Sequence, residues 1–114
     1  MVPPFLAYYG VVNSNTSLIQ EAYRQCELYR QYLRTPETGL WRHILWGPHP
    51  DPGLWATGNG WAAAGMLRVV ASIVNSDYKD DFTAQTNNLT QWVIEIVEAS
   101  FKLQMVSSDD VRNR

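Results

Sequence analysis

The residues best suited to chemistry lie in one aromatic segment near the middle of the chain. Four of the five tryptophans fall within a window of 21 residues that also contains His43; they are Trp41, Trp46, Trp55 and Trp61. Flat indole rings suit the apolar faces of sugar rings, and a histidine offers a hydrogen-bond donor or acceptor near neutral pH. The segment therefore predicts a concave pocket for a carbohydrate.

A glycine-flanked asparagine precedes the helix that we expect to follow this segment. Gly58-Asn59-Gly60 brings the backbone tightly into a helix expected to begin near Trp61. The first N–H groups of a helix have no partner within the helix and lie at its positive end, where a carboxylate binds well. With the indoles of Trp55 and Trp61 beside it, this helix start predicts a site for an acidic sugar.

Each of these residues also has an ordinary structural interpretation. Trp61 opens an apolar helix and by itself is more typical of a core position, and Asn59 is of a type common at a helix N-cap. His43 by itself is more typical of a hydrogen-bonded histidine than of a catalyst, and Asp51, between two prolines, is typical of a turn. Taken one residue at a time, the structural interpretation is the simpler one.

Four helices are expected to position the aromatic segment, over residues 3–12, 17–34, 61–74 and 86–105. Ser17 and Gln20 match a capping box at the start of the second helix, and Pro36 disfavours helix at the residue before it. The third helix has almost no polar face, which predicts burial on all sides. Residues 37–60 are expected to form a loop with a short strand over residues 40–46. The fold class is therefore predicted as all-α, with two helical hairpins joined by an aromatic loop.

Apolar residues at helical spacing predict which helix faces point inward. In the second helix this face carries Leu18, Ala22, Cys26, Tyr29 and Leu33. In the last helix it carries Leu89, Trp92, Val93, Ile96, Val97, Ser100 and Phe101.

Composition excludes several classes of protein. The chain has 114 residues and a net charge of −2, which fits one domain and provides no basic cluster for a nucleic acid or an anionic membrane. The single Cys26 allows neither an internal disulfide nor a cysteine-based metal site. Because no run of 18 apolar residues and no basic leader is present, we expect neither a membrane span nor a targeting segment, and the localisation stays open between secreted and cytoplasmic.

Three ordered stretches resemble consecutive motifs of the unsaturated glycuronyl hydrolases, glycoside hydrolase families 88 and 105. They are MVPPFLA at residues 1–7, GLWRH at residues 39–43 and WATGNGW at residues 55–61, and they are most similar to the unsaturated rhamnogalacturonyl hydrolases. The tail from Ser107 to Asn113 is similar to the approach to a later motif. The resemblance implies an (α/α)6 toroid of six hairpins, of which these helices are about a third. Residues 1–114 are then expected to be a partial six-hairpin domain, truncated at both ends, with exposed apolar patches.

The resemblance also implies a reaction that differs from ordinary glycosidic displacement by a carboxylate pair. An acid/base Asp protonates the C4=C5 enol ether of an unsaturated uronic acid at the end of a pectin-derived rhamnogalacturonan oligosaccharide, and water adds at C5. No metal or other cofactor takes part. In the family this Asp precedes the methionine that matches Met1. No catalytic residue is therefore assigned in this chain, which is expected to be inactive by itself.

By the same resemblance, the substrate-binding residues are His43, Trp55, Thr57, Gly58, Asn59 and Trp61. His43 contacts the oligosaccharide, the two tryptophans line the sugar subsites, and Asn59 with its glycines shapes the loop. Thr57 departs from the pattern, since Arg is common there, and a threonine cannot make the charge-assisted hydrogen bond of an arginine. The alternative from a different class is a non-catalytic sugar-binding or helical interaction remnant. The missing acid favours that alternative, whereas the ordered motifs favour a hydrolase.

Overall fold

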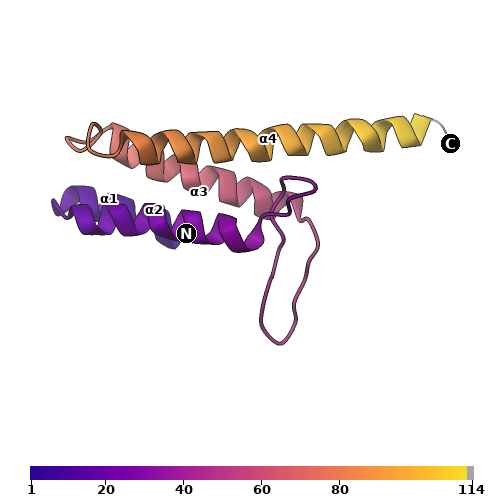
Figure 1. The fold of residues 1–114 in the computed structure, drawn as a ribbon, viewed down its shortest axis with the longest axis horizontal. Coiled ribbons are helices and arrows are strands. Elements are labelled where there is room, and N and C mark those ends of the chain that lie inside the picture. The colour runs from indigo at the N-terminus through magenta and orange to yellow at the C-terminus, as the bar shows by residue number, and fades with distance from the viewer. Residues whose placement is uncertain (113–114) are drawn as a thin grey trace.

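The computed structural model describes residues 1–112, and side chains as far as Val106. Four helices run through these residues: α1 (Val2–Val12), α2 (Thr16–Leu33), α3 (Ala56–Val74) and α4 (Thr83–Arg112) (Figure 1). The predicted all-α class is confirmed, and the arrangement is consistent with part of an α/α toroid. The tail motif that begins at Ser107 lies outside the residues whose side chains are described.

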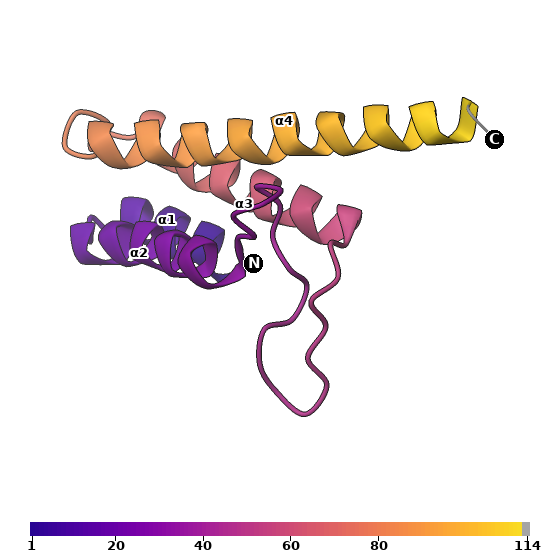
Figure 2. The same cartoon turned by 45° about the vertical axis from the view of Figure 1, so that its right-hand side comes forward.

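The helices pair as two hairpins. α1 packs along α2, α3 packs along α4, and contact between α1 and α3 joins the two pairs. Figures 1 and 2 show the long connection between α2 and α3 projecting away from the helices at one end. The expected strand over residues 40–46 does not form. Only single backbone bridges, Arg34 with Trp41 and Ile44 with Asp51, lie in this connection.

The start of α2 and the end of α4 differ from the prediction for local reasons. Ser14 takes a positive φ of 52°, which turns the chain sharply after α1. Asn15 rather than Ser17 is therefore the N-cap of α2, and its Oδ1 accepts the N–H of Leu18 at 3.3 Å. α4 continues to Arg112 rather than ending near Met105, because no glycine or proline interrupts it. No described helix is both long and apolar enough to cross a membrane.

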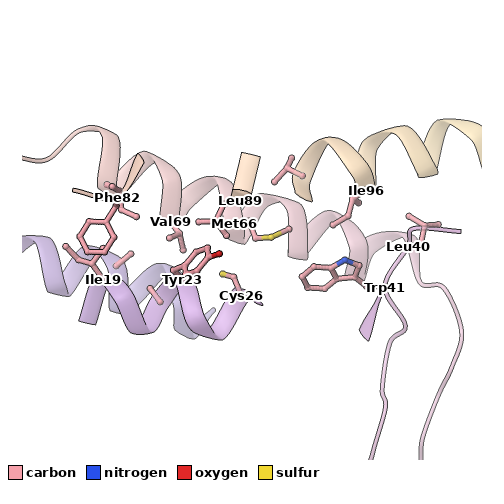
Figure 3. Close-up of a cluster of buried hydrophobic side chains, with 14 of the residues drawn as sticks. Ile19, Tyr23, Cys26, Leu40, Trp41, Met66, Val69, Phe82, Leu89 and Ile96 are labelled. Atoms are coloured by element: carbon pink, nitrogen blue, oxygen red, sulfur yellow. The ribbon is translucent and has the colours of Figure 1, made fainter. Parts of the chain in front are cut away.

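The core lies between the two hairpins. Its five largest fully buried side chains are Ile19, Met66, Val69, Ile73 and Leu89. Figure 3 shows Tyr23 and Cys26 of α2 facing Val69 and Met66 of α3, with Trp41 at the end of the cluster nearest the long connection. An indole from the connection thus completes the core at the end where α3 begins.

α3 is not buried on all sides, contrary to the prediction. Trp61 is 61% exposed, and Leu67 and Val74 are also exposed, because α1 and α4 cover only part of the helix. On α4, Val97 and Phe101 likewise face outward although they were predicted to lie inside. The expectation of exposed apolar patches is therefore confirmed.

Candidate substrate site

α3 begins at Ala56, five residues before the predicted start, so the glycine-flanked Asn59 lies inside the helix. Its first intrahelical bond runs from the Asn59 N–H to the carbonyl of Trp55 at 3.0 Å. The free N–H groups at the helix start therefore belong to Ala56, Thr57 and Gly58 rather than to residues around Trp61. The helix start that was predicted to bind a carboxylate therefore lies about one and a half turns closer to Trp55 than expected.

Asn59 is neither an N-cap nor a solvent-facing ligand. Its side chain is buried, with 3% of the residue exposed, and it forms hydrogen bonds with both the N–H and the carbonyl of Trp41. Oδ1 accepts the Trp41 N–H at 2.8 Å, and Nδ2 donates to the Trp41 carbonyl at 2.9 Å and to that of Trp55 at 3.1 Å. Asn59 thus holds two residues of the long connection, Trp41 and Trp55, against the first turn of α3.

The connection itself folds back as an irregular hairpin. Ile44 and Asp51 exchange backbone hydrogen bonds of 2.9 and 3.0 Å, and the His43 N–H donates to the Gly53 carbonyl at 3.0 Å. We call residues 42–54 the aromatic hairpin. Gly47, near its tip, has a φ of 118°, a backbone conformation that favours glycine.

His43 lies between an acid and an indole. Its Nδ1 is 3.0 Å from Oδ2 of Asp51, and its ring centroid is 4.8 Å from that of Trp55, at an interplanar angle of 56°. The other carboxylate oxygen of Asp51 accepts the Gly53 N–H at 2.9 Å. Hydrogen bonds from His43 and then Gly53 lower the pKa of Asp51. Asp51, predicted to be a turn residue, thus closes the hairpin and holds the imidazole.

A cavity of about 230 Å³ opens between this hairpin and the starts of α1 and α3. We call it the tryptophan cavity. Four of the six predicted substrate-binding residues line it, namely His43, Trp55, Gly58 and Trp61. Thr57 is exposed outside the lining, and Asn59 lies behind it. Trp55 and Trp61 therefore border one space, as the sugar-binding hypothesis requires.

Gly58 lies directly under the indole of Trp55. A Cβ at this position would lie 2.8 Å from Cε3 of that ring, closer than carbon atoms pack. By contrast, a Cβ at Gly60 would meet nothing within 4 Å. Only the first of the two glycines is thus required by the shape of the cavity.

Arg42 is a lining residue that reasoning from the sequence did not single out. It is the only lysine or arginine in the described lining, and no carboxylate is found there. Its Nη2 donates to the Tyr32 carbonyl at 3.2 Å, while its Nε is buried without a hydrogen-bond partner among the described residues. In the sequence, the signal that could have identified Arg42 was its position next to His43 in the GLWRH motif. A guanidinium here suits a carboxylate ligand.

Comparison with known proteins identifies the family. The model of Glycosyl Hydrolase Family 88 matches residues 1–104. The chain belongs to glycosyl hydrolase family 88. No curated protein and no solved structure matches it.

Family 88 membership makes the chain a glycoside hydrolase sequence and its ligand a carbohydrate. The matched region contains α1, α2, α3, most of α4 and all residues around the tryptophan cavity. In this family-88 chain, the indoles of Trp55 and Trp61 and the side chain of Arg42 therefore border one space, and Gly58 in the first turn of α3 also lines it. Chemically this arrangement can hold a sugar ring by its apolar face and a carboxylate by its charge.

Proposed function

We propose that this family-88 chain binds the unsaturated uronic acid at the end of a pectin-derived rhamnogalacturonan oligosaccharide. In this proposal the tryptophan cavity is the uronide site of an unsaturated rhamnogalacturonyl hydrolase. The observation that supports it most directly is that two indoles, Trp55 and Trp61, and one cation, Arg42, line the same cavity. The described lining contains no carboxylate. A neutral sugar would leave that cation without a counter-charge.

The described residues have distinct roles in this proposal. The indoles pack against the ring, and the Arg42 guanidinium pairs with the uronate carboxylate, a role that the uncharged Thr57 cannot fill. Because Gly58 in the first turn of α3 lines the cavity, the positive end of that helix lies beside the same space. His43, held by Asp51, donates a hydrogen bond or accepts one from a ring hydroxyl.

The reaction proposed for the whole protein is hydration of the enol ether. A proton is added at C4 of the C4=C5 double bond and the hydroxyl of water is added at C5. The resulting hemiketal opens to a ketone at C5 and leaves the former ring oxygen on C1 as a hydroxyl. C1 is then a hemiacetal, which collapses to an aldehyde and releases the neighbouring sugar with its own hydroxyl. As the family resemblance implies, we assign the acid/base role to an aspartate that precedes Met1 rather than to any residue of this chain. General acid–base catalysis of this kind contributes roughly 10²–10⁴-fold.

Calorimetric titration of the 114-residue chain tests the binding half of the proposal. We expect the unsaturated galacturonyl-rhamnose disaccharide to bind, and its carboxyl methyl ester to bind about tenfold more weakly because the ester carries no charge to pair with the guanidinium. Arg42→Gln is expected to abolish this preference, whereas Arg68→Gln, on the outer part of α3, is the matched control. Equal binding of acid and ester by the wild-type chain would contradict the proposal.

The catalytic half is tested by following the ultraviolet absorbance of the C4=C5 double bond. We expect no loss of absorbance with residues 1–114 and a steady loss when the residues encoded before Met1 are included. A non-catalytic sugar-binding protein is the second candidate, favoured by the lack of a carboxylate in the described lining. Binding without turnover by the longer chain would support it.

A further inference from the structure

The tryptophan cavity has room for only part of the proposed substrate. Its volume of about 230 Å³ is below the roughly 300–1,000 Å³ of pockets that enclose a drug-sized ligand. The proposed substrate has at least two sugar rings, since the reaction separates the uronide from its neighbour. The ring on the leaving-group side must therefore lie beyond this cavity.

A second depression of about 460 Å³ continues from the cavity, between α2 and the aromatic hairpin. We call it the aromatic groove. It shares Tyr29, Leu33 and His43 with the tryptophan cavity, so the two form one continuous surface. A chain that leaves the cavity past His43 enters this groove directly.

The outer part of the groove is an aromatic platform. Trp46 is 72% exposed, and its ring centroid lies 5.2 Å from that of Tyr32, with the planes inclined at 56°. Both rings are exposed, Tyr32 on α2 and Trp46 on the aromatic hairpin, and neither belongs to the buried cluster, so packing of the core does not account for them. Exposed rings of this kind suit the C–H face of a sugar.

The remaining lining adds hydrogen-bonding capacity without a full charge. Gln25 donates from Nε2 to Glu21 at 3.0 Å, so its own carbonyl oxygen stays available as an acceptor. No Asp, Glu, Lys or Arg is part of the groove's described lining. This contrasts with the cavity, where Arg42 supplies a cation, and it favours a neutral sugar over an acidic one.

We propose that the aromatic groove is a subsite for a neutral sugar on the leaving-group side of the uronide, with Trp46 and Tyr32 as its platform. This inference rests on the proposed function, because it takes the uronide as the occupant of the tryptophan cavity. It adds a specificity element, Tyr32 on α2 with Trp46 on the aromatic hairpin, that lies outside the three sequence motifs.

The test compares two probes on the intact 114-residue chain by calorimetry. One is the methyl glycoside of unsaturated galacturonic acid, which fills the cavity alone; the other is the unsaturated galacturonyl-rhamnose disaccharide. We expect Trp46→Ala to weaken disaccharide binding about three- to tenfold and to leave binding of the methyl glycoside unchanged. Trp46→Phe is expected to restore part of the difference because it keeps a ring. Phe101→Ala, a similarly exposed aromatic on α4, serves as the control.

The outcomes separate the two proposals. If both probes bind and Trp46→Ala weakens the binding of neither, the subsite is wrong while the uronide site stands. If neither probe binds to the folded chain, the proposed function fails and the subsite fails with it. If Trp46→Ala weakens both probes equally, the side chain supports the cavity and the groove is not a separate subsite.

Discussion

The carboxamide of Asn59 pairs with the backbone of Trp41 as a neighbouring β-strand would, donating to its carbonyl and accepting from its N–H. One side chain of a helix thus satisfies both peptide groups of a residue 18 positions earlier in the chain. Trp41 is thereby fixed in the core, and residues 42 and 43, which line the cavity, follow directly from it.

Asn59→Ala is expected to destabilise the protein substantially. Removing the carboxamide leaves the buried N–H and C=O of Trp41 without partners, which costs about 2–3 kcal/mol of unfolding free energy, measurable by urea denaturation. Asn75→Ala is the matched control, because that amide bonds to the Ala71 carbonyl on the surface. Its cost should stay below about 1 kcal/mol. Equal effects of the two substitutions would show that the hydrogen bonds to Trp41 contribute little.

Gly58→Ala and Gly60→Ala are expected to act in opposite ways. Both glycines lie within α3, where alanine is intrinsically favoured by about 1 kcal/mol. At Gly60 nothing opposes this gain, so the unfolding free energy should rise. At Gly58 the new methyl group displaces the Trp55 indole, so near-ultraviolet circular dichroism should change and the uronide should bind more weakly. Unaltered uronide affinity in Gly58→Ala would contradict the assigned place of Trp55.

The Asp51–His43 pair should make stability depend on pH in acid. The folded pKa of Asp51 lies below its ordinary value of 3.8, so the unfolded chain takes up the proton first. The stabilisation is complete above that ordinary value and is lost as the pH falls through the lowered pKa. Asp51→Asn should therefore flatten the decline of unfolding free energy in this acidic range. An NMR titration should show the pKa of Asp51 rising in His43→Gln, and an unchanged pKa would refute the pairing.

Glu95 joins the second and fourth helices through two arginines. Its carboxylate lies 2.8 Å from Nη2 of Arg30 and 3.4 Å from Nε of Arg34, and the three side chains are mostly buried. Glu95→Gln should lower the unfolding free energy by about 1–2 kcal/mol. Glu21→Gln breaks an exposed pair with Arg24 within α2 and should cost less than about 0.5 kcal/mol. High salt should reduce both effects, and a larger loss for Glu21 than for Glu95 would overturn the comparison.

Cys26 should be unreactive in the folded protein. Burial raises the pKa of its thiol from 9.0 to about 11, and the thiolate is the reactive form. At mildly alkaline pH, labelling by iodoacetamide should therefore be slow without denaturant and rise steeply across the urea unfolding transition. Labelling that is fast in the native state and independent of urea would contradict this placement of the residue.

The helices were predictable because periodic apolar residues and local breakers define them. The start of α3 was not, since two glycines in one turn are typical of a loop, and only the link from Asn59 to Trp41 shows what holds that turn in place. Burial of α3 on all sides was mispredicted because an apolar sequence cannot reveal how many neighbours cover a helix. The residues around the cavity came from motif resemblance. Arg42 was passed over because its importance depends on which neighbours share its space.

The division into two hairpins has a consequence for the order in which the molecule assembles. α1 with α2, and α3 with α4, are neighbours in sequence that close over short turns, and such local contacts form quickly. The tryptophan cavity takes residues from both pairs and from the connection between them, so we expect it to be completed last. Mild destabilisation should then abolish sugar recognition while the helical circular dichroism persists, which makes ligand affinity an early indicator of separation between the halves.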